Sequence, residues 1–258
     1  MKTSHLLLGS LIIVSPLAIN ASTGTVAQAE AQALLGSLAQ HFADIHTLSY
    51  TAERTTQGRR QSSRERWLFA YQSPGFVRVD YQYPTERHLI LTTNSLTEYI
   101  PSLRRALQTD LALMSASVRQ STIKQTLAHI SLDGINPSNF QEMVKRTVSV
   151  INPAQEPDRV LISGANPRFT IEVNPIQKVL RTTDIYTSDN DFLLHSEASK
   201  FTEASPGFWY PQQLNTRYLT EQGFVNTFTV ISDIKINSPP PPTLFQFTPP
   251  GHVTLDKR

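Results

Sequence analysis

The stretch from Arg64 to Tyr81 constrains the fold of this chain most, because it reads as two antiparallel strands joined by a turn at Ser73-Pro74-Gly75. Side chains alternate between the two faces of a strand. Charged residues mark one face of each strand, so the residues between them share the opposite face. That face is apolar and strongly aromatic: Trp67, Phe69, Tyr71, Val77, Val79 and Tyr81. Such a surface has to be covered, either by the protein's own core or by a bound apolar ligand.

The first 21 residues have the organisation of a secretory signal peptide. A lysine follows the initial methionine, residues 6–18 are mostly apolar, and small residues follow at Ala21-Ser22. The apolar run is too short and too weakly flanked for a transmembrane span. We expect cleavage after Ala21, with Ala27 or Ala29 as alternatives. The competing interpretation is a buried N-terminal helix.

Cysteine is absent from the sequence. The chain therefore has no cysteine to carry a lipid anchor, and it needs no disulfide in an oxidising compartment. No later apolar run is long enough to cross a bilayer. These features predict a soluble exported protein.

Residues 22–258 are expected to form a single domain, since that length supports a substantial core. The net charge of +2, with a sequence pI near 8.9, argues against a dedicated nucleic-acid-binding protein. The 17 prolines suit a β-rich fold with many turns.

The first part of the domain predicts a helix followed by a meander of strands. Within residues 29–43, Leu34, Leu38 and Phe42 recur at helical spacing. Strand-forming residues bounded by turn residues then follow in several segments: 45–55, 64–72, 76–81, 88–92 and 96–100.

The middle of the chain predicts helices instead. Residues 102–132 contain no proline or glycine and place Leu103, Leu107 and Leu111 four residues apart. Residues 138–148 form a second helical segment with Ser138 as a candidate N-cap. We therefore expect a helical insert over about residues 102–148.

Strands return in the last part of the domain. The predicted segments, each bounded by Asn, Asp, Gly or Pro, are 160–163, 168–173, 179–187, 193–201, 209–218 and 224–236. The four prolines at 239–242 predict a stiff, extended connection. An order of helix, strands, helices and strands predicts an α+β fold with a strongly curved antiparallel sheet and helices on one side.

Three segments carry a resemblance to a known family. Phe245 to Asp256 contains a Phe-x-Phe pair before Pro-Pro, the hairpin turn contains a central proline, and Glu86 to Pro101 forms the next strand pair. In these segments the chain resembles the LolA family, periplasmic carriers that take lipoproteins to the outer membrane, in which the Phe-x-Phe segment is a strand. The family typically has an arginine before the turn proline, linked to opening a lid, whereas this chain has Ser73.

The resemblance implies a half-closed antiparallel β-barrel with helices lidding a hydrophobic cavity. The aromatic face of the hairpin would then line the cavity; the alternative for these residues is ordinary sheet core. The lid helices would use two sets of apolar residues, for which simple helix packing is the alternative: Leu34, Leu38, Phe42, Leu103, Leu107 and Leu111.

Arginines gather near the turn that precedes the hairpin. Arg59, Arg60 and Arg64 are candidates for contact with an acidic partner or with anionic lipid headgroups. A solvated surface is the alternative.

Patterns for catalysis or metal binding are missing from the sequence. The seven histidines are scattered without metal-binding spacing, and there is neither a Gly-x-Ser-x-Gly motif nor a cysteine nucleophile. We expect a protein that is not an enzyme and that uses no cofactor or metal.

The function implied by the resemblance is that of a periplasmic chaperone that shields the acyl chains of lipoproteins between the inner and the outer membrane. Its partners would be an inner-membrane release complex and an outer-membrane acceptor, contacted transiently by a monomer. Two alternatives remain: a carrier of another lipid or amphiphile, and an envelope sensor or regulator similar to the RseB family.

Overall fold

The computed structural model describes residues 19–59, 62–119, 140–153, 155–251 and 253–257. The predicted signal peptide falls mostly on residues 1–18, outside these ranges. Its last part overlaps strand β1 (Ile19–Thr23), which contains the expected cleavage point after Ala21. None of the helices in the described ranges is long and apolar enough to span a membrane.

The described residues form few helices and many strands. The helices are α1 (Thr25–Ala43), α3 (Phe140–Arg146), a helical stretch at residues 116–119 and two 3-10 turns, η1 (Pro101–Leu103) and η2 (Leu111–Leu113). Seven strands precede α3: β1, β2 (Thr47–Gln57), β3 (Ser62–Gln72), β4 (Phe76–Tyr83), β5 (Arg87–Leu91), β6 (Ser95–Ile100) and β7 (Arg105–Asp110). The remaining strands are β8 (Thr147–Pro153), β9 (Val160–Gly164), β10 (Phe169–Asn174), β11 (Val179–Tyr186), β12 (Phe192–Ser205), β13 (Phe208–Thr220), β14 (Gly223–Ile236) and β15 (Thr254–Lys257).

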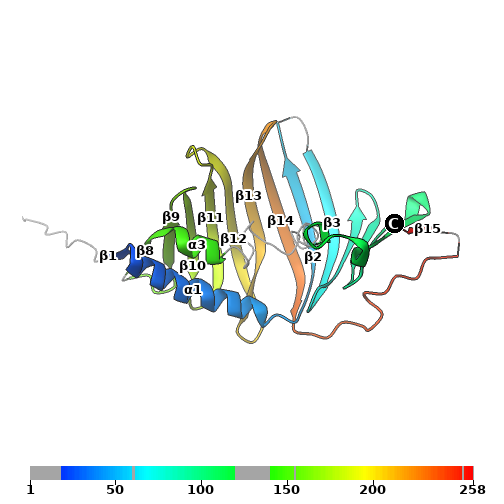
Figure 1. The fold of residues 1–258 in the computed structure, drawn as a ribbon, viewed down its shortest axis with the longest axis horizontal. Coiled ribbons are helices and arrows are strands. Elements are labelled where there is room, and N and C mark those ends of the chain that lie inside the picture. Colours follow the sequence, from blue (N-terminus) through cyan, green and yellow to red (C-terminus); the bar gives the residue numbers. More distant parts are fainter. Residues whose placement is uncertain (1–18, 60–61, 120–139, 154, 252, 258) are drawn as a thin grey trace, which may run out of the picture.

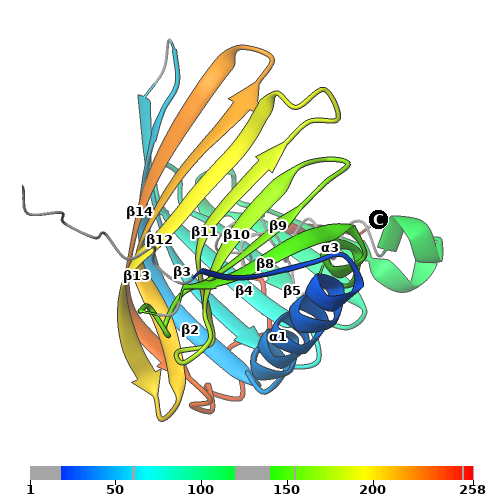
Figure 2. The same ribbon diagram turned by 90° about the vertical axis from the view of Figure 1, so that its left-hand side faces the viewer.

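All of these strands belong to one sheet, in the order β1-β8-β9-β10-β11-β12-β13-β14-β2-β3-β4-β5-β6-β7-β15. Neighbouring strands are antiparallel except β15, which runs parallel to β7. The sheet is strongly curved (Figures 1 and 2). The predicted curved antiparallel sheet is therefore confirmed.

The sheet does not close into a barrel. Its two edges are β1 and β15, which lie at opposite ends of the strand order. We therefore describe an open curved sheet where the half-closed barrel was expected. We call the face on which α1 lies the inner face and the opposite one the outer face (Figure 2).

Helix α1 forms where the sequence predicts a helix, and it packs on one half of the inner face. Ala27, Ala31, Leu35 and Leu38 recur every three or four residues and are all buried. The helix packs mainly against α3, β8 and β1. It ends at Asp44, whose backbone N–H donates to the Gln40 carbonyl. The apolar stripe of α1 is thus used to seal the β8 side of the sheet.

The predicted hairpin is confirmed as β3 and β4, with Ser73 to Gly75 as its turn. The register pairs Trp67 with Tyr81, Phe69 with Val79 and Tyr71 with Val77. The alternation of side chains therefore places all six predicted residues on the inner face.

The predicted helix around Leu103, Leu107 and Leu111 is wrong. Leu103 lies in η1 and is 66% exposed, Leu107 lies in strand β7, and Leu111 starts η2 and is fully buried. Residues 105–110 form strand β7 and not a helix because β6 and β15 supply hydrogen-bond partners on both sides of this segment. Such tertiary pairing overrides local helical spacing. Within the rest of the predicted insert, residues 116–119 are helical, α3 covers residues 140–146 and residues 147–148 already belong to β8, while residues 120–139 are outside the described ranges.

The Phe-x-Phe segment is not a strand either. Phe245 and Phe247 lie in a C-terminal tail that crosses the outer face, where their rings lie 5.8 Å from Phe76 and 5.3 Å from Tyr99. Prolines on both sides of this segment lack the N–H groups that a sheet ladder needs, so only Thr254 to Lys257 extends the sheet.

Candidate functional site

The inner face carries two hydrophobic clusters side by side. The α1 cluster combines α1 and α3 with residues of β8 to β11. The aromatic cluster combines inner-face residues of β2, β3, β4, β12, β13 and β14 with Leu91 and Leu111. Both clusters lie on the same face of the sheet. Residues that pair in register share a face, so Ile171 of the α1 cluster, Thr183 and Ser196 lie on one face. Ala198 of the aromatic cluster follows Ser196 by two residues on the same strand and therefore lies on that face as well.

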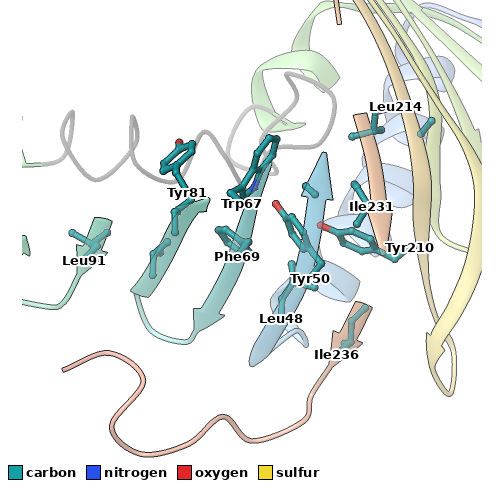
Figure 3. Packing of buried hydrophobic residues seen from close by; sticks show 14 of the residues in the cluster. Leu48, Tyr50, Trp67, Phe69, Tyr81, Leu91, Tyr210, Leu214, Ile231 and Ile236 are labelled. Carbon is teal, nitrogen blue, oxygen red and sulfur yellow. The ribbon is translucent and has the colours of Figure 1, made fainter. Parts of the chain in front are cut away.

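The aromatic cluster is built around rings from four strands (Figure 3). Tyr50 stacks on Phe69 at 4.8 Å between ring centroids and lies 5.9 Å from the ring of Tyr210. Trp67 lies 6.3 Å from the ring of Tyr81. Strands far apart in the sequence thus form one continuous aromatic surface.

Several of these rings carry a polar end inside the cluster. Burial raises the pKa of Tyr50 above its ordinary value of 10.0, and burial also raises the pKa of Tyr81. Both phenols are therefore neutral at physiological pH. The surface is apolar but has hydroxyl groups in its centre, which distinguishes it from a core of aliphatic residues.

The structure gathers all six hairpin residues that the sequence singles out. Trp67, Phe69, Val77, Val79 and Tyr81 are buried in the aromatic cluster, and Tyr71 packs against it while partly exposed. Their role as the wall of a lipid cavity stays a prediction.

The predicted lid residues do not share one location. Leu38 is buried in the α1 cluster, and Leu34 and Phe42 pack against that cluster. Leu111 belongs to the aromatic cluster, whereas Leu103 is exposed. Helix α1 therefore lies over the β8 half of the sheet rather than over the hairpin.

Sequence reasoning missed the contributions of the distant strands. Tyr210, Leu214 and Ile231 complete the aromatic cluster from β13 and β14. Tyr50 and Ala52 of β2 could have been found, because residues 48–54 alternate in the same way as the hairpin.

The arginines divide between the two faces. Arg54, on the inner face, places its guanidinium 4.9 Å from the ring of Trp67 and donates from Nε to Thr229 Oγ1 at 3.2 Å. Arg87 lies 4.3 Å from the ring of Tyr81. Of the predicted contact residues, Arg64 pairs with Glu53 at 2.6 Å while largely exposed, Arg59 is exposed, and Arg60 is outside the described residues.

The C-terminal tail closes over a small cavity on the outer face. Its volume is about 250 Å³, and it lies between the tail residue Leu244 and outer-face residues of β2, β3, β4 and β14. Both signs of charge line it: Arg78, Asp80, Asp233 and Lys235.

Arg78 ties this tail to the sheet. Its Nη1 donates to the Leu244 carbonyl at 2.8 Å, and its Nε lies 2.8 Å from Asp80, which also contacts His88 Nδ1 at 2.6 Å. Burial opposes ionisation of Asp80, but the hydrogen bonds from His88 and Arg78 hold its pKa below the ordinary range. The hydrogen bond to Asp80 raises the pKa of His88.

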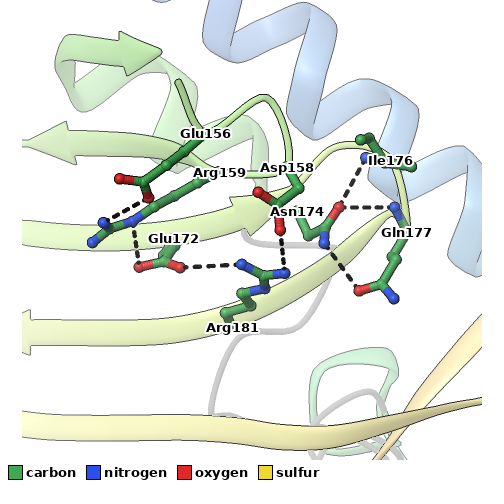
Figure 4. Close-up of polar contacts among 8 residues, drawn as sticks. All are labelled: Glu156, Asp158, Arg159, Glu172, Asn174, Ile176, Gln177 and Arg181. Atoms are coloured by element: carbon green, nitrogen blue, oxygen red, sulfur yellow. Dashed lines mark hydrogen bonds and ion pairs between the residues drawn. The ribbon is translucent and has the colours of Figure 1, made fainter. Parts of the chain in front are cut away.

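A second ion-pair network lies on the outer face behind the α1 cluster (Figure 4). Glu172, whose side chain is only 14% exposed, sits between Arg159 at 3.2 Å and Arg181 at 3.8 Å. Arg181 also pairs with Asp158 at 2.7 Å, and Arg159 with Glu156 at 3.1 Å. The network connects the loop before β9 to β10 and β11.

No protein-family model matches the sequence, and no curated protein matches it. Among solved structures, the chain is similar to a DUF1329 family protein from Desulfovibrio piger, with a TM-score of 0.53 and 9% identity over 85% of this chain and 97% of that one. It is also similar to a putative outer membrane lipoprotein-sorting protein domain from Vibrio parahaemolyticus (TM-score 0.49, 10% identity, 84% and 97% covered). A LolA superfamily protein from Nitrosomonas europaea matches with a TM-score of 0.46 and 11% identity over 81% of this chain and 94% of that one.

These similarities concern the fold. The Desulfovibrio piger protein supports a shared fold, since its TM-score exceeds 0.5. The chain therefore shares its fold with that protein, and the resemblance read from the sequence, which predicts a curved sheet of this kind, agrees with it at the level of the fold.

Proposed function

We propose that the protein is a periplasmic carrier that binds acyl chains on the aromatic half of its inner face and takes acylated lipoproteins from the inner to the outer membrane. One observation carries the proposal. The aromatic cluster is a continuous apolar cluster contributed by seven strands of one curved sheet, with five aromatic rings within it. The sequence resemblance to lipoprotein carriers supports the choice of cargo.

The energetics of such a carrier require no catalytic group. Each methylene that leaves water contributes about 0.8 kcal/mol, so an acyl chain is held by apolar walls alone. Part of this gain is offset by the loss of translational and conformational freedom on binding. Direction then comes from differences in affinity, with an inner-membrane release complex supplying cargo and an outer-membrane acceptor removing it.

Native mass spectrometry of the protein purified from its own periplasm identifies the cargo. A bound acylated lipoprotein is the expected result, and a bound free lipid would indicate a carrier of another amphiphile. A protein that carries nothing and instead binds the periplasmic segment of a membrane regulator would overturn the carrier and favour the envelope sensor.

A ladder of saturated fatty acids tests the binding surface directly. If the chain lies against apolar walls, the dissociation constant falls about fourfold for each added methylene. Val79→Glu, at a fully buried position of the aromatic cluster, is expected to abolish this dependence. Trp67→Ala serves as a milder variant if Val79→Glu does not fold.

Leu68→Glu is the matched control, because Leu68 lies on the outer face of the same hairpin and is 40% exposed. It is expected to bind the ladder as the unchanged protein does. Equal affinity of the unchanged protein for short and long chains would remove the proposal, as would equal losses in Leu68→Glu and Trp67→Ala.

A further inference from the structure

The inner face of the aromatic half changes character along its strands. At the end nearest the β2–β3 and β13–β14 turns, one row of residues in direct register across six strands consists entirely of hydroxyl side chains. In strand order from β11 to β3, the members of this hydroxyl row are Thr183, Ser196, Thr216, Thr227, Thr56 and Ser63.

The next row, two residues further along each strand, brings the charged groups onto this face. It places Arg54 between Thr229 and Glu65. The following rows are apolar or aromatic: Ala52 pairs with Trp67, and Tyr50 with Phe69. From Arg54 to Leu48 the β2 strand spans about 20 Å at 3.4 Å per residue. On β2 and β3 the inner face is therefore polar at this end and apolar over the rest of its length. On β11 to β14 the hydroxyl row instead lies between apolar rows, with Ile185, Leu194, Tyr218 and Val225 on its other side.

Arg54 has unused capacity for hydrogen bonds in this polar part. Thr183 Oγ1, which is buried and has no hydrogen-bond partner within the described ranges, lies four strands from β2 in the sheet, about 19 Å at 4.8 Å per strand, and is too far away to share a headgroup with Arg54. Arg54 is partly buried, uses its Nε on Thr229, and makes no ion pair in the part of the chain that the structure describes. A partly buried guanidinium gains most from an anionic oxygen group, which forms charge-assisted hydrogen bonds with it.

We propose that Arg54 and the two hydroxyls of the row beside it, Thr56 and Thr227, form a headgroup site, which orients an amphiphile with an anionic, oxygen-rich head at this end of β2 and its acyl chain along the aromatic rows. The site rests on the proposed carrier function and specifies the chemistry of its ligand. Arg54 binds the anionic oxygens, and the hydroxyls of Thr56 and Thr227 donate to the remaining acceptors. Glu65, the register neighbour of Arg54, opposes the anion and limits its affinity, so that the head can be released.

Dodecyl phosphate and dodecanol, which share one acyl chain and differ in the head, provide the test by calorimetric titration. The unchanged protein is expected to bind dodecyl phosphate at least tenfold more tightly. Arg54→Gln removes this difference and leaves the affinity for dodecanol within twofold. Thr227→Val, which keeps the shape of the side chain, weakens the binding of dodecyl phosphate severalfold. Glu65→Gln strengthens the binding of dodecyl phosphate.

Arg66→Gln is the control, since Arg66 follows Glu65 in β3 but lies on the outer face, half exposed and 3.6 Å from Glu53. It is expected to change neither affinity. Equal binding of the two probes by the unchanged protein would overturn the headgroup site while leaving the carrier intact. Binding of neither probe would overturn the carrier itself.

Inorganic phosphate distinguishes a lipid head from a free anion. It is expected to compete with dodecyl phosphate only at concentrations far above those of the probe, because it lacks the chain that the aromatic rows bind. Competition at the same concentration as dodecyl phosphate would assign the site to a free anion and contradict the proposal.

Discussion

The two halves of the inner face are parts of one sheet, yet their side chains differ. In the α1 half, helix packing brings aliphatic residues together, and Phe140 and Phe169 are the aromatic members of that cluster. In the other half, Tyr50, Trp67, Phe69, Tyr81 and Tyr210 dominate the cluster. Helices α1 and α3 thus complete an ordinary core at one end of the sheet. The aromatic half has the rigid, amphipathic side chains that suit contact with a ligand.

The difference predicts that stability and ligand binding can be changed separately. Leu35 is fully buried between α1 and the sheet, so Leu35→Ala should lower the free energy of unfolding by about 2–5 kcal/mol. Urea unfolding measures this loss. The affinity of the folded variant for dodecanol should stay unchanged, because Leu35 belongs to the α1 cluster.

Ser37→Ala is the control for this change, since Ser37 lies on the exposed side of the same helix. Its effect on the free energy of unfolding should stay within about 0.5 kcal/mol. A loss of dodecanol affinity in Leu35→Ala would show that the two halves act as a single site.

Two histidines, His88 on the outer face of β5 and His41 on α1, should respond to pH in opposite directions. On β5, the hydrogen bond to Asp80 raises the pKa of His88 above 6.5, with Arg78 and Glu86 also nearby. Its stabilising effect is present below pH 6.5 and is lost as the pH rises through the folded-state pKa. On α1, burial and then Lys178 lower the pKa of His41, against a smaller opposite effect of Asp44. Its effect is present above pH 6.5 and is lost as the pH falls through the folded-state pKa.

Melting temperatures of His88→Gln and His41→Gln, followed from pH 5 to pH 8, test these signs. His88→Gln should lower the melting temperature most at pH 5, whereas His41→Gln should lower it least at pH 5. Parallel profiles for the two variants would contradict the assignment of their environments.

The smallest effect is expected from the ion-pair network behind the α1 cluster. Arg181→Met removes a 2.7 Å pair with the half-exposed Asp158 and a 3.8 Å contact with Glu172, which keeps Arg159 as its partner, so the change should cost little. The melting temperature should fall by about 2 °C or less, and the difference should shrink in 1 M salt because ions screen the pairs. A large, salt-independent loss would mean that the network supports the fold as strongly as the helix does.

The helix α1 and most strands could be predicted from the sequence, because their signals are local. The failure at Leu103, Leu107 and Leu111 has a physical reason: their spacing fits a helix, but β6 and β15 offered backbone partners that no local pattern reveals. The strand predicted for the Phe-x-Phe segment is wrong for a similar reason, because Phe245 and Phe247 contact aromatic rings on the outer face and do not pair with a neighbouring strand.

The hairpin from Arg64 to Tyr81 was determined by its sequence alone, because a period of two assigns each side chain to a face without reference to the rest of the chain. Only the tertiary structure decided what shares that face. The hydroxyl row joins Thr56 to Thr183, and Arg54 meets Thr229, through strand register set by long-range pairing. Register between distant strands depends on the whole sheet, so the polar end of the inner face could not be read from any single segment.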